Sequence, residues 1–179
     1  MSEIPTPVWS LLGVVLGFSL GEGSRWMREK VRIKRLMRTI RVELTAVLAQ
    51  ISDKKDILRQ AMEELNNGRV LPMVAVRSIT LGYKSSIEEL YEYYSDIERN
   101  CLHVIYDTLR VADEHMDSFH DDFQKAVKDG VVKDPWEAFV GYLQDLVDSY
   151  EIIEKLIDSY LKDSPVDVFH IKARGKAGL

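Results

Sequence analysis

The chain has one cysteine, Cys101, among its 179 residues. A single cysteine excludes an intramolecular disulfide and argues against a zinc site built on thiolates. Cys101 falls on the apolar stripe of a predicted helix, so we interpret it as a buried, unreactive thiol. This cysteine usage fits a reducing compartment.

Residues for catalysis are also scarce. The chain has four histidines, and the sequence contains no phosphate-binding loop, no nucleophile elbow, no His-Glu-x-x-His helix and no EF-hand loop. We therefore predict a protein that is not an enzyme and has no cofactor.

Helix-breaking residues are rare through the middle of the chain. Of the 10 glycines, four lie between Gly13 and Gly23 and two close the chain at Gly175 and Gly178. Because 46% of the residues are hydrophobic and 30% are charged, the composition is typical of a folded protein. The length suits one domain with an appendage, and the lack of breakers favours long helices.

Basic charge is concentrated in one short segment. Residues 22–41 hold eight basic and two acidic side chains, whereas residues 42–179 hold 16 basic and 26 acidic ones. The first segment therefore carries a net charge of +6 and the remainder −10. Such a split indicates that the first segment meets a negatively charged surface.

An uncharged run from Ile4 to Leu20 precedes this basic segment. We predict a transmembrane helix over residues 7–24, although the 15 residues from Pro7 to Gly21 fall short of the roughly 20 that span a bilayer. Trp9 and Trp26 are 17 residues apart, about 26 Å along a helix, which suits one aromatic near each interface. A buried core helix and an interfacial helix are the alternatives.

The basic residues set the predicted orientation. No lysine or arginine precedes the apolar run, whereas eight follow it, so the positive-inside rule places residues 1–6 outside and the remainder in the cytoplasm. A basic segment before the run and a small-residue cleavage site after it are both missing, which indicates an uncleaved anchor. The predicted location is the cell (inner) membrane, with a single pass.

Two surfaces of this anchor are candidate contact sites. The basic juxtamembrane helix over residues 25–41 would bind anionic lipid headgroups rather than nucleic acid, because it directly follows an apolar run. The predicted membrane-interface residues are Trp9, Trp26, Arg25, Arg28, Lys30 and Arg32. Gly13, Gly17 and Gly21 recur every four residues and would form a smooth face for helix association.

The remainder predicts an all-α fold. A heptad-like apolar stripe continues to Asn66, interrupted at Lys54, which we interpret as wet surface. The stripe suits either a coiled coil between chains or one wall of an intramolecular bundle, and the later amphipathic helices favour the bundle. An irregular connector over residues 70–81 and a helix from Ser85 or Ser86 to about Lys128 are expected next.

Asp134-Pro135-Trp136-Glu137 predicts the start of a last helix, which closes near Lys162. Residues 42–163 would then form a cytoplasmic antiparallel bundle of three long helices plus a short connector, followed by a basic flexible tail at 164–179. The cluster Tyr91-Glu92-Tyr93-Tyr94 could bind a partner through aromatic anchors, but Tyr91 and Tyr94 fit the core side of the second helix, which favours packing in the core.

One polar cluster has the spacing of a metal site. Asp113, Asp117, His120 and Asp121 share a helix face, and Asp117-x-x-His120 matches the carboxylate–histidine spacing of di-iron bundles. A solvated acidic face explains the same residues.

The leading hypothesis is a membrane-anchored interaction or regulatory protein whose bundle binds a protein partner or self-associates; a metal-binding enzyme or sensor is the alternative. A sensor of small molecules is neither favoured nor excluded by the sequence.

Overall fold

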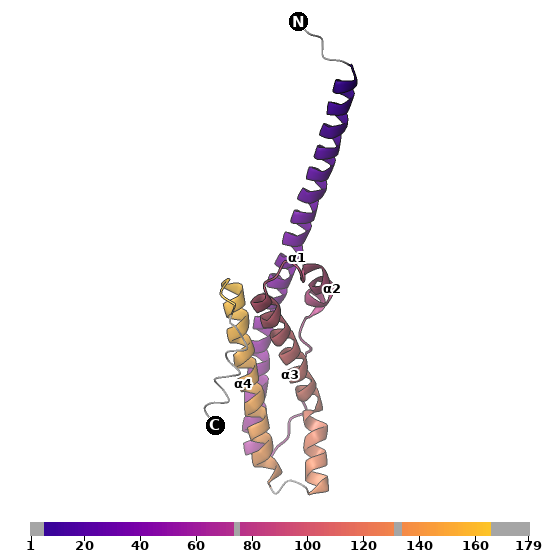
Figure 1. Ribbon diagram of the computed structural model, residues 1–179. Coiled ribbons are helices and arrows are strands. Elements are labelled where there is room, and N and C mark those ends of the chain that lie inside the picture. Colours follow the sequence, from indigo (N-terminus) through magenta and orange to yellow (C-terminus); the bar gives the residue numbers. More distant parts are fainter. Residues whose placement is uncertain (1–5, 74–75, 131–133, 166–179) are drawn as a thin grey trace.

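The computed structural model describes residues 6–73, 76–130 and 134–165, with side chains from residue 13 onward. Over these residues the chain forms four helices and no strand (Figure 1). The helices are α1 (Thr6–Asn66), α2 (Leu81–Leu90), α3 (Asp96–Asp129) and α4 (Pro135–Leu161). The predicted all-α fold is therefore confirmed.

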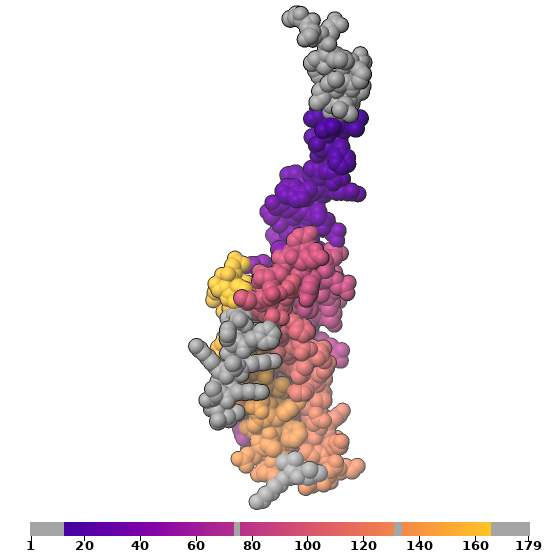
Figure 2. Space-filling view, viewed as in Figure 1, coloured from indigo at the N-terminus to yellow at the C-terminus, as the bar shows by residue number. Residues whose placement is uncertain are grey.

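Helix α1 is continuous over 61 residues, about 90 Å at 1.5 Å per residue. Gly21 and Gly23 lie within it and do not break it. Its N-terminal part stands clear of the other helices (Figures 1 and 2), and Ile33 is the first buried apolar residue. We call residues 13–32 the projecting segment of α1.

The described residues do not provide a membrane-spanning helix. No helix among them combines the length and the apolar character that crossing a bilayer requires. The transmembrane helix predicted over residues 7–24 is thus not supported by this part of the chain.

The predicted single helix from Ser85 or Ser86 to Lys128 is wrong, because the chain breaks at residues 91–95 and forms α2 and α3 instead. Ser95 caps α3: its hydroxyl accepts from the Glu98 N–H, while the Glu98 carboxylate accepts from the Ser95 N–H at 2.8 Å. This capping box is a strong helix start. Helix α2 begins earlier than expected, at Leu81, and Ser86 is buried inside it.

The ends of the last two helices follow their sequence signals. Gly130 terminates α3 with a positive φ of 63°, a conformation that glycine adopts without strain. Asp134 accepts hydrogen bonds from the Trp136 and Glu137 N–H groups, and Pro135 occupies the first turn of α4. The predicted start and end of this helix are confirmed.

Side-chain pairs define how the helices run. Glu43 and Lys54 of α1 meet Tyr106 and Asp113 of α3, so these two helices are parallel, and the predicted antiparallel arrangement is wrong for this pair. Helix α4 runs antiparallel to both, as its Tyr150–Asp113 contact and the Arg41–Leu161 contact show. The connector that follows α1 returns along the bundle to α2 (Figure 1), which makes the parallel pair possible.

A single apolar core lies between α1, α3 and α4. Helix α4 packs directly against both neighbours, and its buried face includes Leu143, Tyr150 and Ile157. At the distal end of the bundle Phe123 packs edge-to-face with Trp136 and Phe139. Between α1 and α3 the contacts are instead made by polar side chains and by the connector.

Candidate functional site: a polar seam between α1 and α3

Five polar side chains connect α1, α3 and α4 beside the connector, and we call them the polar seam: Glu43, Lys54, Tyr106, Asp113 and Tyr150. Lys54 is 3% exposed and Asp113 is 6% exposed, and they form a buried ion pair. Lys54 interrupts the apolar stripe of α1, and the prediction that it lies on a solvent-exposed surface is wrong. The apolar surroundings make each charge costly alone, so each depends on the other.

Asp113 also holds the connector in place. Its second carboxylate oxygen accepts from the Ser78 N–H at 2.7 Å, while the first accepts from the Tyr150 hydroxyl at 3.0 Å. Lys54 donates to the Ser78 hydroxyl at 2.9 Å. Burial, followed by the negative charge of Asp113, raises the pKa of Tyr150 well above its ordinary value. Tyr150 therefore stays a neutral donor to the carboxylate.

Glu43 plays the same part at the start of α2. Its carboxylate accepts from the Gly82 N–H, from the Tyr83 N–H at 3.1 Å and from the Tyr106 hydroxyl at 2.7 Å. The first turn of a helix carries unsatisfied N–H groups and a positive partial charge, so a carboxylate from α1 stabilises it. Thr80, the N-cap residue of α2, makes no such bond with its own side chain.

Gly82 allows this close approach without displacing either neighbour. A β-carbon at this position would lie 2.9 Å from Glu43 Oε2 and 3.0 Å from Thr39 Cγ2, both closer than van der Waals contact allows. Beside it, the Tyr83 ring stacks on Tyr106 with centroids 3.9 Å apart. Burial and the hydrogen bond to Glu43 raise the pKa of Tyr106 far above its ordinary value.

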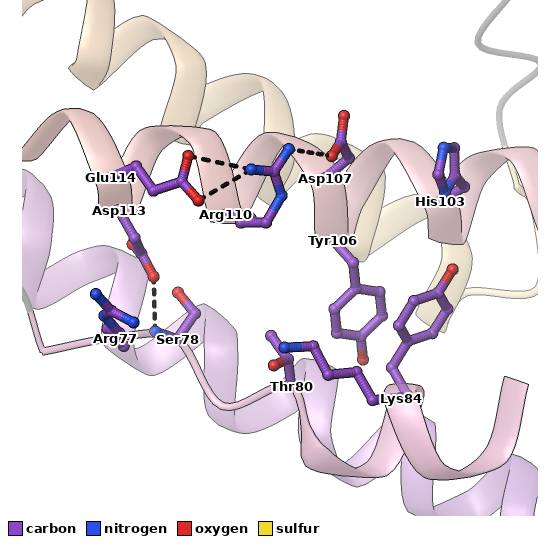
Figure 3. A pocket seen from close by; sticks show the side chains of 11 residues that line it. Arg77, Ser78, Thr80, Lys84, His103, Tyr106, Asp107, Arg110, Asp113 and Glu114 are labelled. Carbon is purple, nitrogen blue, oxygen red and sulfur yellow. Dashed lines mark hydrogen bonds and ion pairs between the residues drawn. The ribbon is translucent and has the colours of Figure 1, made fainter.

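A cavity of about 270 Å³ opens beside the seam, between the connector and α3. Figure 3 shows its walls: Arg77, Ser78 and Thr80 from the connector, Lys84 from α2, and Tyr106, Arg110 and Asp113 from α3. Arg110 is held between Asp107, at 2.8 Å, and Glu114, at 2.9 Å. The arrangement lines the opening with hydrogen-bonding groups, among them the Ser78 hydroxyl, which lies 2.9 Å from the Lys54 amine.

The predicted metal ligands do not come together. Asp113 is buried against Lys54, Asp117 lies 3.6 Å from Arg77, and His120 contacts Gln124 at 2.8 Å. Asp121 is exposed. Among the described residues no group of three or more acidic, histidine or cysteine side chains is arranged to hold a metal ion. Helical spacing places the four side chains on one side of α3, but Asp113, Asp117 and His120 each contact a different residue instead of converging on one point.

The predicted membrane-interface residues lie on or beside the projecting segment. Trp26 is exposed, with the Lys30 amine 4.8 Å from its ring centre. Arg25 contacts Glu22 at 3.5 Å, and Arg28 is exposed. Trp9 lies outside the residues whose side chains are described.

Two arginines of the basic segment belong to the bundle instead. Arg32 pairs with Glu89 of α2, and Arg41 donates to the Leu161 carbonyl and to Asp163 at 2.6 Å, which satisfies the end of α4. The basic segment is thus divided between contacts with the fold and exposed charges.

The glycine face of the projecting segment is open. A β-carbon added at Gly13, Gly17 or Gly21 would meet no atom within 4 Å.

Of the two predicted core tyrosines, Tyr94 is buried and Tyr91 is exposed, so the prediction for Tyr91 is wrong.

Comparison with known proteins gives no match: no family model fits the chain, and neither curated proteins nor solved structures resemble it.

Sequence reasoning missed Glu43 and Lys54 as buried groups. Glu43 precedes Leu44 on the stripe of α1 and resembles an ordinary flanking acid. The only available signal was that Lys54 occupies a core position of the helical stripe, between the apolar residues Ile51 and Leu58. Its partner is 59 residues away in sequence, beyond the reach of any helical periodicity.

Proposed function

We propose that the protein is a membrane-anchored, non-enzymatic helical interaction protein. Residues 7–24 of α1 enter an anionic bilayer in a single pass, with the basic residues that follow at the headgroups and the bundle on the cytoplasmic side. The bundle then binds a protein partner or a second copy of the chain.

The observation that carries this proposal is the exposure of apolar side chains along the projecting segment. Val14, Phe18 and Leu20 are 70%, 71% and 73% exposed, whereas Leu44 on the same helix is 0% exposed. Leaving apolar surface in water costs roughly 25 cal/mol per Å². A continuous apolar column of this kind is stabilised by a non-aqueous environment, which a bilayer supplies.

The adjoining basic charges favour an anionic bilayer. Arg25, Arg28 and Lys30 follow the apolar residues within about three helical turns and are exposed. Each such charge near an anionic surface contributes about 1 kcal/mol. Their position on the bundle side of the apolar run supports a cytoplasmic bundle by the positive-inside rule.

Two surfaces are available for protein contacts. On the outer side of α4, Asp145, Asp148 and Ile152 are exposed and suit a partner with basic and apolar groups. The open glycine face of α1 suits close packing of a second helix within lipid. The polar seam supports a non-enzymatic bundle, since Glu43 and Asp113 are both engaged in holding the connector.

Vesicle flotation tests the anchor directly. The full chain is mixed with vesicles of phosphatidylcholine alone or with 30% phosphatidylglycerol, and the floating fraction is measured before and after a carbonate wash. We expect flotation with both, resistance to carbonate, and tighter binding to the anionic vesicles. Protein that stays in the aqueous fraction with both vesicle types contradicts the proposal, and loss in carbonate contradicts a spanning anchor.

Variants separate the two contributions. Phe18→Glu should abolish flotation, because a charge in the apolar column is costly in lipid. Replacing Arg25, Arg28 and Lys30 with glutamine should remove only the preference for anionic vesicles. Arg59→Gln is the matched control, since Arg59 is an exposed arginine at the far end of the same helix.

Crosslinking in membranes at native expression tests the interaction role. We expect a crosslinked dimer or a heteromeric product that Gly17→Leu or Asp148→Lys weakens. Recovery of monomer alone, in the membrane and after detergent extraction, contradicts it.

A further inference from the structure

The cavity beside the polar seam contains hydrogen-bond donors that the fold does not use. We propose that this cavity binds a small, soluble, phosphate-bearing molecule through Lys84, Thr80 and Ser78. The assignment to a soluble ligand rests on the proposed membrane anchor, whereas binding of a phosphate group in the cavity does not.

The three donors come from the connector and from the first turn of α2, and all three line the cavity. The Lys84 amine and the Thr80 hydroxyl have no hydrogen-bond or ion-pair partner among the described residues. The Ser78 hydroxyl accepts from Lys54 at 2.9 Å, which leaves its own hydrogen free to donate. In Figure 3 the three side chains border the same opening, with Lys84 beside Thr80. Three donors around one space suit the several acceptor oxygens of a phosphate group.

The other charged side chains of the cavity are engaged in ion pairs, and the group of Arg110, Asp107 and Glu114 carries one excess negative charge. Asp113 is paired with Lys54, and Arg110 is held between Asp107 and Glu114. Arg77 lies at the rim, 82% exposed and 3.6 Å from Asp117. Lys84 is therefore the cation of the cavity that has no carboxylate partner among the described residues, and it attracts an anion. The carboxylates of Asp107 and Glu114 limit the charge that the cavity accepts, which favours a single phosphate group.

The size and position of the cavity define the ligand further. A volume of about 270 Å³ equals roughly nine water molecules at about 30 Å³ each, enough for a phosphate group and a few more atoms. The connector lies opposite Glu43 to Lys54 of α1. Glu43 is 17 residues beyond Trp26, about 25 Å along the helix. A headgroup in the bilayer would not reach the cavity, so the ligand comes from solution.

NMR titration of the full chain with inorganic phosphate tests this site. The protein is held in nanodiscs of neutral lipid, and phosphate replaces chloride at constant ionic strength while amide shifts are followed. We expect saturable shifts confined to residues 77–84 and the facing turns of α3. Acetate, with two oxygens, should bind several-fold more weakly than phosphate.

Variants make the assignment specific. Lys84→Ala should weaken phosphate binding by about tenfold, and Thr80→Val by several-fold, because each removes one donor to a charged acceptor. Lys155→Ala removes an exposed lysine from the far surface of α4 and should leave binding unchanged. Unchanged circular dichroism of each variant establishes that the bundle is intact.

Three results would overturn the proposal. Shifts that grow linearly without saturation show only general ion effects, and equal binding by Lys84→Ala shows that the phosphate lies elsewhere. A third nanodisc series uses anionic lipid and no phosphate. If the same shifts appear there, the ligand is a lipid headgroup and the assignment to a soluble molecule is wrong.

Discussion

The two ends of α1 belong to one continuous helix, but the other helices of the bundle cover only its C-terminal part. In the projecting segment Val14, Phe18 and Leu20 are exposed, whereas Ile40, Leu44 and Val47 farther along are buried. Both stretches are rich in apolar residues, and both are fully helical. Helix formation depends on local backbone hydrogen bonds, so it continues whether or not other helices cover the surface. Burial is decided by which neighbours return to pack on it.

The largest effect is expected from breaking the ion pair in the buried part of α1. Lys54→Met should destabilise the bundle by about 3–5 kcal/mol, because it leaves Asp113 buried without its cation. Urea unfolding of the full chain in neutral micelles, followed by tyrosine near-ultraviolet circular dichroism, measures this. The double variant Lys54→Met/Asp113→Leu should recover part of the loss, because it removes the unpaired charge but leaves the Ser78 N–H and the Tyr150 hydroxyl without their acceptor. A cost below about 1 kcal/mol for the single variant would show that water reaches the pair.

A matched pair of leucine variants tests the comparison most directly. Leu44→Ala should cost about 2–5 kcal/mol, since it removes fully buried methyl groups and leaves a cavity. Leu20→Ala, on the projecting segment, should leave the unfolding free energy of the bundle unchanged within about 0.5 kcal/mol. Equal costs would mean that the projecting segment is packed against the bundle in solution.

High pH should destabilise the bundle through its buried tyrosines. Burial, reinforced by a hydrogen bond to Glu43 for Tyr106, raises the folded-state pKa of Tyr106, Tyr150 and Tyr160 above the ordinary value. Above about pH 10 the unfolded chain loses these protons while the folded chain keeps them, so stability falls as pH rises. The expected slope is up to about 1.4 kcal/mol per pH unit for each tyrosine.

Tyr106→Phe should reduce this slope by about one such increment, whereas the exposed Tyr93→Phe should not change it. Denaturant unfolding between pH 9 and pH 11 provides the measurement. An unchanged slope for Tyr106→Phe would indicate that the Tyr106 hydroxyl is accessible to solvent in the native state.

The smallest effect separates two arginines of the basic segment. Arg41→Gln should cost about 1 kcal/mol, because Arg41 satisfies the Leu161 carbonyl at the end of α4 while its contact with exposed Asp163 is weak. Arg28→Gln should leave stability unchanged and reduce only vesicle binding. Thermal unfolding compares the two, and a stability loss for Arg28→Gln would assign that arginine to the fold.

Much of the fold was accessible from local patterns. The heptad-like stripe predicted α1 up to Asn66, and Asp134-Pro135 predicted the start of α4, since each signal acts within a few residues. The break before α3 was missed although Ser95 and Glu98 have capping-box spacing, because the apolar stripe continues through Tyr94 and Cys101 and hides the boundary. The membrane anchor and the protein partner remain predictions.

The sequence alone determined that the chain is helical, where α1 and α4 end, and that basic charge follows the apolar N-terminal run. These features depend on interactions between residues close in the chain. Only the tertiary structure decided that Glu43, Lys54 and Asp113 are buried and hold the connector, with Gly82 allowing the close approach. Their partners lie 24 to 63 residues away, and a buried charge is stable only where the fold brings such a partner to it.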